Sequence, residues 1–174
     1  MKFFIIPILF LCLVSCKSVD VSSDYDRTTN FTAYKSYNYF SNIDSGLTEL
    51  DEQRLIYAID SILEQKSFVK SETPDFLINI QSQTFQSAER SSVSVGIGGG
   101  GGNVGGGVSV GIPVGEGQLD REVVFEFLDA KTQSLFWHAI GKQSIPNKTT
   151  PELREQIIKD VASEILSVYP PEKE

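Results

Sequence analysis

The sequence is poor in the residues on which much protein chemistry depends. Its 174 residues include two cysteines, one histidine, one tryptophan and one methionine. Both cysteines, Cys12 and Cys16, lie near the N-terminus, so the rest of the chain has no thiol for a disulfide or a metal. No apolar run reaches the roughly 20 residues that a membrane-spanning helix requires. The hydrophobic core alone must therefore stabilise the folded part.

Positive charge is also scarce. Lysine and arginine number 15 against 23 aspartates and glutamates, which gives a net charge of −8. An acidic chain of this kind is unsuited to nucleic acid, and long-range electrostatics would repel it from anionic lipid. We therefore expect no nucleic-acid partner.

An export signal occupies the N-terminus. Lys2 precedes an apolar run over residues 3–14, which is too short to span a membrane and is typical of a secretory signal. The run ends in the segment Leu13-Val14-Ser15-Cys16, the pattern at which a bacterial lipoprotein signal is cut. We predict that residues 1–15 are removed and that Cys16 is the lipidation site, acylated on its sulfur and its amino group. The alternative is an ordinary signal peptide with a chance cysteine.

Removal of this signal leaves 159 residues with a net charge of −9. Two or more acyl chains hold a protein stably on a bilayer. Lys17, rather than an aspartate, follows Cys16, which favours the outer membrane over retention at the inner membrane. We therefore expect a lipid-anchored protein of the bacterial cell envelope that faces the periplasm from the outer membrane.

The mature chain has the length of one domain. We predict a lipidated tether over residues 16–23, a single domain over 24–171 and a solvated tail over 172–174. Strands are expected to begin at Val19 or Val21 and to follow at 36–40, from 76 onward, at 119–128 and at 135–141. The predicted class is α+β in two layers, with an about five-stranded, mostly antiparallel sheet and two amphipathic helices on one face.

Both helices carry start signals. Thr48 is the expected N-cap of the first helix, and Thr150 with Pro151 begins the second. Helical spacing predicts a buried face of Leu55, Ala58, Ile59, Ile62 and Leu63 on the first helix. On the second it predicts a buried stripe of Leu153, Ile157, Val161, Ile165 and Val168.

A glycine-rich insertion spans residues 93–117. Twelve of the 14 glycines lie between positions 96 and 117, and the segment 93–97 recurs as 108–112. Alternating valines and serines around a glycine run favour two β arms with a flexible tip, although a disordered insertion is an open alternative. The insertion is a mobile binding loop, an oligomerisation strand or a tolerated surface segment between two strands.

The strand over 119–128 shows regular alternation. One face carries Val123, Phe125 and Phe127 together with Arg121, and the other face is more polar. This pattern predicts a strand with one buried face.

Candidate chemistry is limited to a few side chains on predicted strands. The only histidine stands beside the only tryptophan, and it is either a plain strand residue on the outer face or, remotely, the base of a hydrolase. Three tyrosines near residue 36 form an aromatic cluster that either fills the core or stacks against sugars and peptides. The candidate binding surface therefore comprises Tyr34, Tyr37, Tyr39, Trp137 and His138. We expect no catalytic residue, no metal site and no cofactor.

Several short motifs follow one another along the chain in a characteristic order. They are Asp24-Tyr25-Asp26, Phe31, Tyr34-Lys35-Ser36-Tyr37, Pro74-Asp75, Leu135-Phe136-Trp137 and Val168-Tyr169-Pro170-Pro171. With the first helix and the glycine-rich insertion, this order resembles bacterial lipoproteins that carry domain of unknown function 4136, over about residues 19–171. Tyr39 stands where members often have tryptophan, and Ala139 where glycine is common. The resemblance implies a lipid anchor and a compact α+β domain, and it brings no known activity.

Two classes of function follow from these patterns. The first is a non-enzymatic, membrane-anchored module that binds an envelope protein or has a structural role. The second is a lipoprotein that binds a small ligand or glycan through the aromatic cluster.

Overall fold

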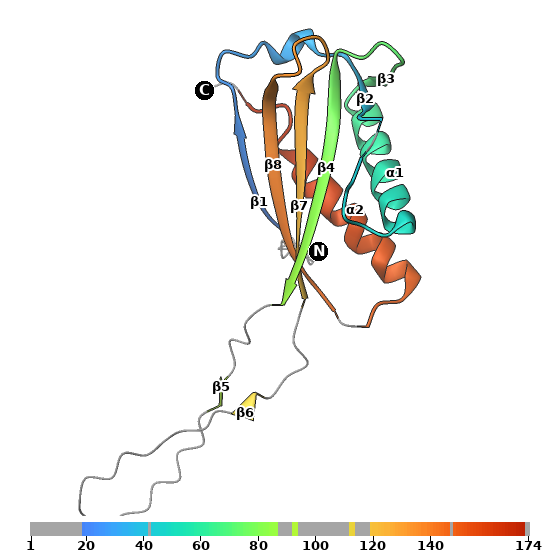
Figure 1. The fold of residues 1–174 in the computed structure, drawn as a ribbon, viewed down its shortest axis with the longest axis vertical. Coiled ribbons are helices and arrows are strands. Elements are labelled where there is room, and N and C mark those ends of the chain that lie inside the picture. The colour runs from blue at the N-terminus through green and yellow to red at the C-terminus, as the bar shows by residue number, and fades with distance from the viewer. Residues whose placement is uncertain are drawn as a thin grey trace, which may run out of the picture.

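Six strands form one mixed sheet, and two helices pack against one of its faces (Figure 1). The computed structural model describes residues 19–41, 43–86, 92–93, 112–113, 119–146 and 148–172. The strands of this sheet are β1 (Val19–Tyr25), β2 (Ser36–Tyr39), β3 (Val69–Lys70), β4 (Phe76–Gln86), β7 (Leu119–Asp129) and β8 (Leu135–Ile145). The helices are α1 (Glu49–Gln65) and α2 (Pro151–Ser167), and a short 3-10 turn spans Phe31–Ala33. The predicted α+β class is confirmed.

The sheet has the strand order β1-β8-β7-β4-β2-β3. Neighbours are antiparallel from β1 to β4, whereas β2 is parallel to both β4 and β3. The sheet is therefore mixed and has one strand more than the predicted five. The parallel pairs arise because the chain passes through α1 after β2, and this helical crossover returns it in the same direction for β3 and then β4. The two residues of β3 are too few to show strand alternation in the sequence.

Helix α1 begins as predicted. Thr48 is the N-cap, and its Oγ1 accepts a hydrogen bond from the backbone N–H of Asp51 at 3.4 Å. The predicted apolar face packs inward: Leu55, Ala58, Ile59 and Leu63 are buried and Ile62 is half-buried. The first helix is therefore amphipathic and covers the sheet.

Helix α2 begins as predicted but is rotated from its predicted face. Thr150 Oγ1 accepts a hydrogen bond from the Leu153 backbone N–H at 3.3 Å, and Pro151 is the first helical residue. The buried residues are Ile158, Val161, Ala162, Ile165 and Leu166. Leu153 is 42% exposed and Val168 is also exposed, so the predicted stripe was wrong at both ends. The helix packs against α1 as well as β8, so its buried face also includes Ala162, next to Val161, and Leu166, next to Ile165.

The core lies between this sheet and the helices. Val123, Phe125 and Phe127 of β7 are buried, which confirms the predicted alternation. Strand β8 runs four residues beyond its predicted end because it pairs along the whole of β7, with Ile145 opposite Leu119. At Gly141, an added Cβ would lie 2.8 Å from Ile165 of α2, so glycine permits the close approach of α2 to β8.

Parts of the predicted insertion and the lipidation site fall outside the described residues. Strands β5 (Ser92–Val93) and β6 (Ile112–Pro113) pair in antiparallel fashion. The remainder of the insertion lies outside the described residues, as do the signal peptide and Cys16. Neither described helix has the length and apolar character needed to cross a bilayer.

Candidate functional site

The predicted aromatic cluster lies where α1 meets the sheet. The hydroxyls of Tyr37 and Tyr39 both donate hydrogen bonds to Asp60 Oδ1, at 2.8 and 2.7 Å. Lys70 Nζ contacts the other oxygen of this carboxylate at 3.0 Å. Tyr37 is buried and Tyr39 is half-buried. These two rings therefore contribute to the core, and their polar ends are bound by one carboxylate of α1.

The other aromatic candidates are also packed. The ring of Tyr34 stacks on Phe136 with centroids 4.2 Å apart, and its hydroxyl donates to Asp129 Oδ2 at 3.1 Å. Trp137 is fully buried and lies 4.9 Å from the ring of Tyr169. The structure thus brings Tyr37 and Tyr39 together, and it places Trp137 inside the core rather than on a surface.

The packed phenols make the fold sensitive to alkali. Burial, reinforced by the hydrogen bond to Asp129, raises the pKa of Tyr34 to about 12. Burial also raises the pKa of Tyr37, Tyr39 and Tyr169. In the unfolded chain these groups ionise near pH 10, so the unfolded state loses protons first and stability falls as pH rises. We expect unfolding between pH 10 and about 12 in a titration that records phenolate absorbance and circular dichroism together.

A titration in which all six tyrosines ionise independently near pH 10, with no change in the circular dichroism spectrum, would contradict this expectation. That result would show that the phenols are in contact with water.

His138 lies on the outer face of the sheet, away from the helices. In the strand register it is opposite Asp24 of β1 and Glu126 of β7. A shallow hollow of about 270 Å³ beside it is lined by residues 24–26 and 135–138, none of which is serine, threonine or cysteine. Within the described ranges, no three histidine, cysteine, aspartate or glutamate side chains are grouped to hold a metal. The residues that line this hollow therefore offer a histidine base no serine, threonine or cysteine nucleophile to activate.

The outer face of β1, β8, β7 and β4 is acidic with an apolar middle. Both helices lie behind the sheet, and no described helix or strand covers this face (Figure 1). Three rows of cross-strand neighbours run from β1 to β4: Asp24-His138-Glu126-Asn79, Ser22-Ile140-Val124-Gln81 and Asp20-Lys142-Glu122-Gln83. Ile140 and Val124 form the middle row's apolar pair, and the only amine in these rows, on Lys142, lies 3.2 Å from Glu122 Oε1. We call these twelve residues the outer face.

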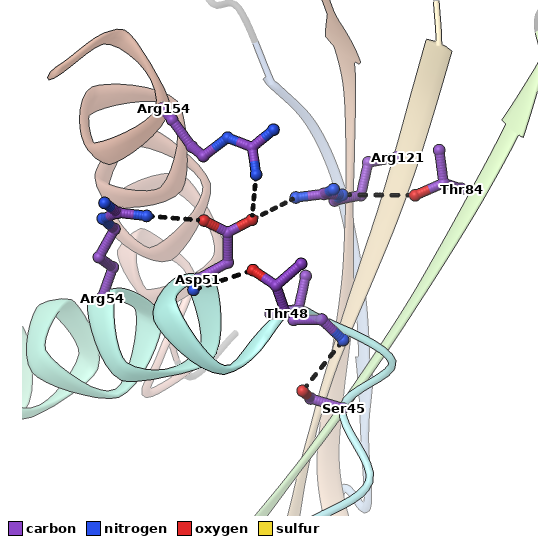
Figure 2. A network of polar contacts seen from close by, with 8 residues as sticks. Ser45, Thr48, Asp51, Arg54, Thr84, Arg121 and Arg154 are labelled. Atoms are coloured by element: carbon purple, nitrogen blue, oxygen red, sulfur yellow. Dashed lines mark hydrogen bonds and ion pairs between the residues drawn. The ribbon is translucent and has the colours of Figure 1, made fainter. Parts of the chain in front are cut away.

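A buried carboxylate surrounded by three guanidinium groups lies where α1 begins (Figure 2). The side chain of Asp51 is 1% exposed. Its Oδ1 accepts a hydrogen bond from Arg54 Nη1 at 2.9 Å, and its Oδ2 accepts one from Arg154 Nη1 at 3.0 Å. Arg121 Nη1 lies 4.0 Å from the same Oδ2. Because these residues belong to α1, α2 and β7, the carboxylate connects both helices to the central strand. We call these four residues the arginine cluster.

The arginine cluster has a surplus of positive charge. Three guanidinium groups surround one carboxylate, and Arg121 Nε also donates to Thr84 Oγ1 at 3.4 Å. Burial lowers the pKa of the Arg121 guanidinium and the neighbouring Arg154 lowers it further, while Asp51 raises it. Gln143, opposite Arg121 on β8, is buried, and its Oε1 has no hydrogen-bond partner within the described ranges. Guanidinium groups in this arrangement bind carboxylate or phosphate oxygens through charge-assisted hydrogen bonds.

No sequence motif identifies the arginine cluster. One signal was available, because Arg121 shares a strand face with Val123, Phe125 and Phe127. An arginine in register with core residues requires a carboxylate nearby, since an unpaired buried charge is costly. The identity of that carboxylate, 70 positions earlier in the chain, depends on the tertiary structure.

Comparison with known proteins gives one family and a small set of similar folds. The family model described as domain of unknown function (DUF4136) matches residues 21–171. A search of curated proteins gives no match. A crystal structure of a PDZ domain protein from Parabacteroides distasonis is similar at 12% identity with a TM-score of 0.59; the match covers 90% of this chain and 37% of that one.

Two structures of a PelC dodecamer from Paraburkholderia phytofirmans are also similar. A variant in space group C2 has 10% identity and a TM-score of 0.50, with 86% of this chain and 96% of that chain covered. The structure in space group P6 has 11% identity and a TM-score of 0.46, with 86% and 95% covered. The present chain spans little more than a third of the PDZ domain protein, and at these identities the likeness concerns the fold alone.

Proposed function

The chain belongs to the family of domain of unknown function DUF4136, and from this premise we propose that it is a lipid-anchored, non-enzymatic lipoprotein of the bacterial cell envelope that binds a partner protein. The family resemblance drawn from the motifs is confirmed over residues 21–171. The observation that carries the proposal is the outer face, a sheet surface that no described helix or strand covers and that has carboxylates around an apolar middle.

Anchoring rests on the N-terminal sequence. The segment Leu13-Val14-Ser15-Cys16 follows a short apolar run, and only residues 17 and 18 separate the acylated cysteine from β1. Lys17 favours transfer to the outer membrane. The folded domain would then be held at the periplasmic surface of that membrane.

The chemistry of the outer face defines the kind of partner. Its rows contain four carboxylates and one amine, and half-buried Ile140 and Val124 lie between the acidic rows. A partner segment with basic residues on either side of an apolar centre would complement this pattern. We propose a basic, partly apolar segment of an envelope protein as the ligand.

An enzymatic or glycan-binding role has less support. His138 lies beside carboxylates, and with Cys16 acylated the mature chain would have no free thiol. The buried positions of Tyr37 and Trp137 remove two of the rings on which glycan stacking would depend. We therefore propose recognition through the outer face.

Charge reversal on β1 tests this surface. Asp20 and Asp24 are exposed, so the double variant Asp20→Lys/Asp24→Lys should fold normally. We expect binding of the envelope partner to weaken by about tenfold or more, because like charges opposed across an interface disfavour association. The measurement is the yield of partner captured by a photo-crosslinking residue placed at Ser22.

The matched control carries the same change of charge on the helical side. Glu64→Lys/Glu155→Lys alters two exposed helical residues and should leave the crosslink at Ser22 unchanged. An equal loss of crosslinked partner in both double variants would show that net charge, rather than the outer face, controls binding. A crosslink to the same partner from position 155 instead of position 22 would place recognition on the helices.

A further inference from the structure

The start of β1 determines which end of the domain is nearest to the lipid. Val19, the first residue of β1, is buried and pairs with Gln143 at the end of β8. Cys16 lies three residues earlier, and three extended residues span at most about 11 Å. An acylated Cys16 would therefore hold this end of the sheet close to the bilayer surface.

The same end carries the arginine cluster. The register places Val19, Gln143, Arg121 and Thr84 in one row across four strands. Adjacent strands are about 4.8 Å apart, so Arg121 lies two strands, or about 10 Å, from Val19. Because Asp51 binds Arg121 and Arg154, the first turns of both helices belong to this end as well (Figure 2). We call it the anchor end.

The anchor end combines guanidinium groups with exposed apolar side chains. Arg154 is 41% exposed, and the side chains of Arg54 and Arg121 are partly exposed. Leu50 and Leu153, in the first turns of the two helices, are 63% and 42% exposed. Guanidinium groups bind phosphate oxygens, and exposed leucines enter the boundary between headgroups and acyl chains.

A hollow of about 450 Å³ adds a further apolar contribution at this end. It is lined by Val19, exposed Phe85 and the hydrophilic residues Asp20, Asp120, Lys142, Gln143 and Ser144. Aromatic side chains are favoured at the boundary of a bilayer. Phe85 thus provides an apolar group on the sheet side of the anchor end, as the leucines do on the helical side.

The short tether, rather than the net charge of the protein, determines which end of the domain faces the bilayer. The mature chain is acidic, so long-range electrostatics would not bring it to an anionic surface. A short linker instead gives an effective concentration in the millimolar range, at which weak contacts become occupied. Exposed apolar side chains alone would not determine which end faces the bilayer, because Val69 and Leu135 are exposed at the opposite end.

We infer that the anchor end lies against the bilayer that holds the acyl chains of Cys16, with the arginine cluster at the lipid phosphates and Leu50, Leu153 and Phe85 at the headgroup boundary. This inference rests on the proposed lipid anchor. In this orientation the outer face stands upright on the membrane and is accessible from the side. The turn between β7 and β8 lies at the opposite end, about 35 Å away along β8.

Two matched labels test the orientation. After export and acylation the mature chain has no free thiol, so a single introduced cysteine gives a single fluorescent label. Lys148→Cys lies just after β8 at the anchor end, and Lys131→Cys lies in the turn at the opposite end; both side chains are exposed. The full lipidated protein is reconstituted in vesicles of phosphatidylethanolamine and phosphatidylglycerol that carry a headgroup nitroxide, a short-range quencher.

We expect the label at position 148 to be quenched several-fold more strongly than the label at 131. In a Leu50→Ser/Leu153→Ser background, quenching at 148 should fall while the protein stays with the vesicles. Equal quenching at both positions would overturn the inference, because the domain would lie flat. Stronger quenching at 131 would reverse the orientation and also overturn it.

The outcomes separate this inference from the proposal on which it depends. A protein that does not float with the vesicles at all would contradict the lipid anchor. A protein that floats but shows no excess quenching at 148 would retain the anchor and refute the orientation.

Discussion

Asp51→Ala is expected to lower the free energy of unfolding by about 3–5 kcal/mol, because it leaves three guanidinium groups at the helix–sheet junction without their shared carboxylate. Removing one partner of a buried ionic group costs more than the intact group contributes, since the remaining, partly buried guanidinium groups lose their counter-charge and repel one another. Asp51 contacts α1, α2 and β7, so the loss should affect the whole domain. Urea unfolding followed by circular dichroism measures the change.

An exposed carboxylate on the same helix provides the control. Glu64→Ala should change the free energy of unfolding by no more than about 0.5 kcal/mol, because exposed substitutions have small effects. If Asp51→Ala were as mild as Glu64→Ala, the arginine cluster would not connect the helices to the sheet. Asp51→Asn keeps the side-chain size and removes the charge, so its cost reports the ionic contribution separately.

Cys16→Ser is expected to abolish acylation and the membrane association that depends on it. One acyl chain binds a bilayer only marginally, and each buried methylene contributes about 0.8 kcal/mol, so loss of all chains shifts partitioning by many orders of magnitude. The variant should be expressed behind a conventional secretory signal in place of residues 1–15, so that its N-terminus is processed. Detergent phase separation and intact mass spectrometry measure the result.

The second cysteine is a matched control. Cys12→Ser alters the apolar run of the natural signal, and it should leave the mature mass and the detergent partitioning unchanged. Acylated protein in the Cys16→Ser sample would contradict the anchor. Natural protein with a bare N-terminus would do so too.

The lipid anchor and the arginine cluster both bear on how the protein would work. The anchor would confine the domain to a membrane surface, and the short tether would limit the directions in which it faces. The arginine cluster would stabilise the end that we infer to be nearest to that surface. The outer face would then be presented beside the membrane, where an envelope partner can reach it.

Most elements follow from local patterns in the sequence. Thr48 and Thr150 cap their helices as predicted, because a cap depends on the few residues that follow it. The alternation of Val123, Phe125 and Phe127 predicts a strand with one buried face, because this pattern also depends on a few consecutive residues. The predicted lipoprotein signal is likewise a linear pattern, which ends at Cys16.

Other features could not be predicted from local sequence patterns. Leu153 and Val168 fit the helical period of α2, yet they are exposed, because the buried face of the helix is rotated toward Ile158, Ala162 and Leu166. Strand β3 is recognised only by its pairing with β2. Tyr37 and Tyr39 share one face of β2, but no strand pattern shows that Asp60 of α1 accepts a hydrogen bond from both.

The sequence by itself determined the helix starts, the strand faces and the predicted lipid attachment, since each is encoded within a few neighbouring residues, and the order of short motifs along the chain determined the family. Only the tertiary structure decided that Asp51 meets Arg154, 103 positions later, and that Val19 shares a row with Arg121. Such neighbours depend on strand register and helix packing, which the whole core sets at once. A periodic pattern shows which side of an element is buried, but not which residue lies opposite it.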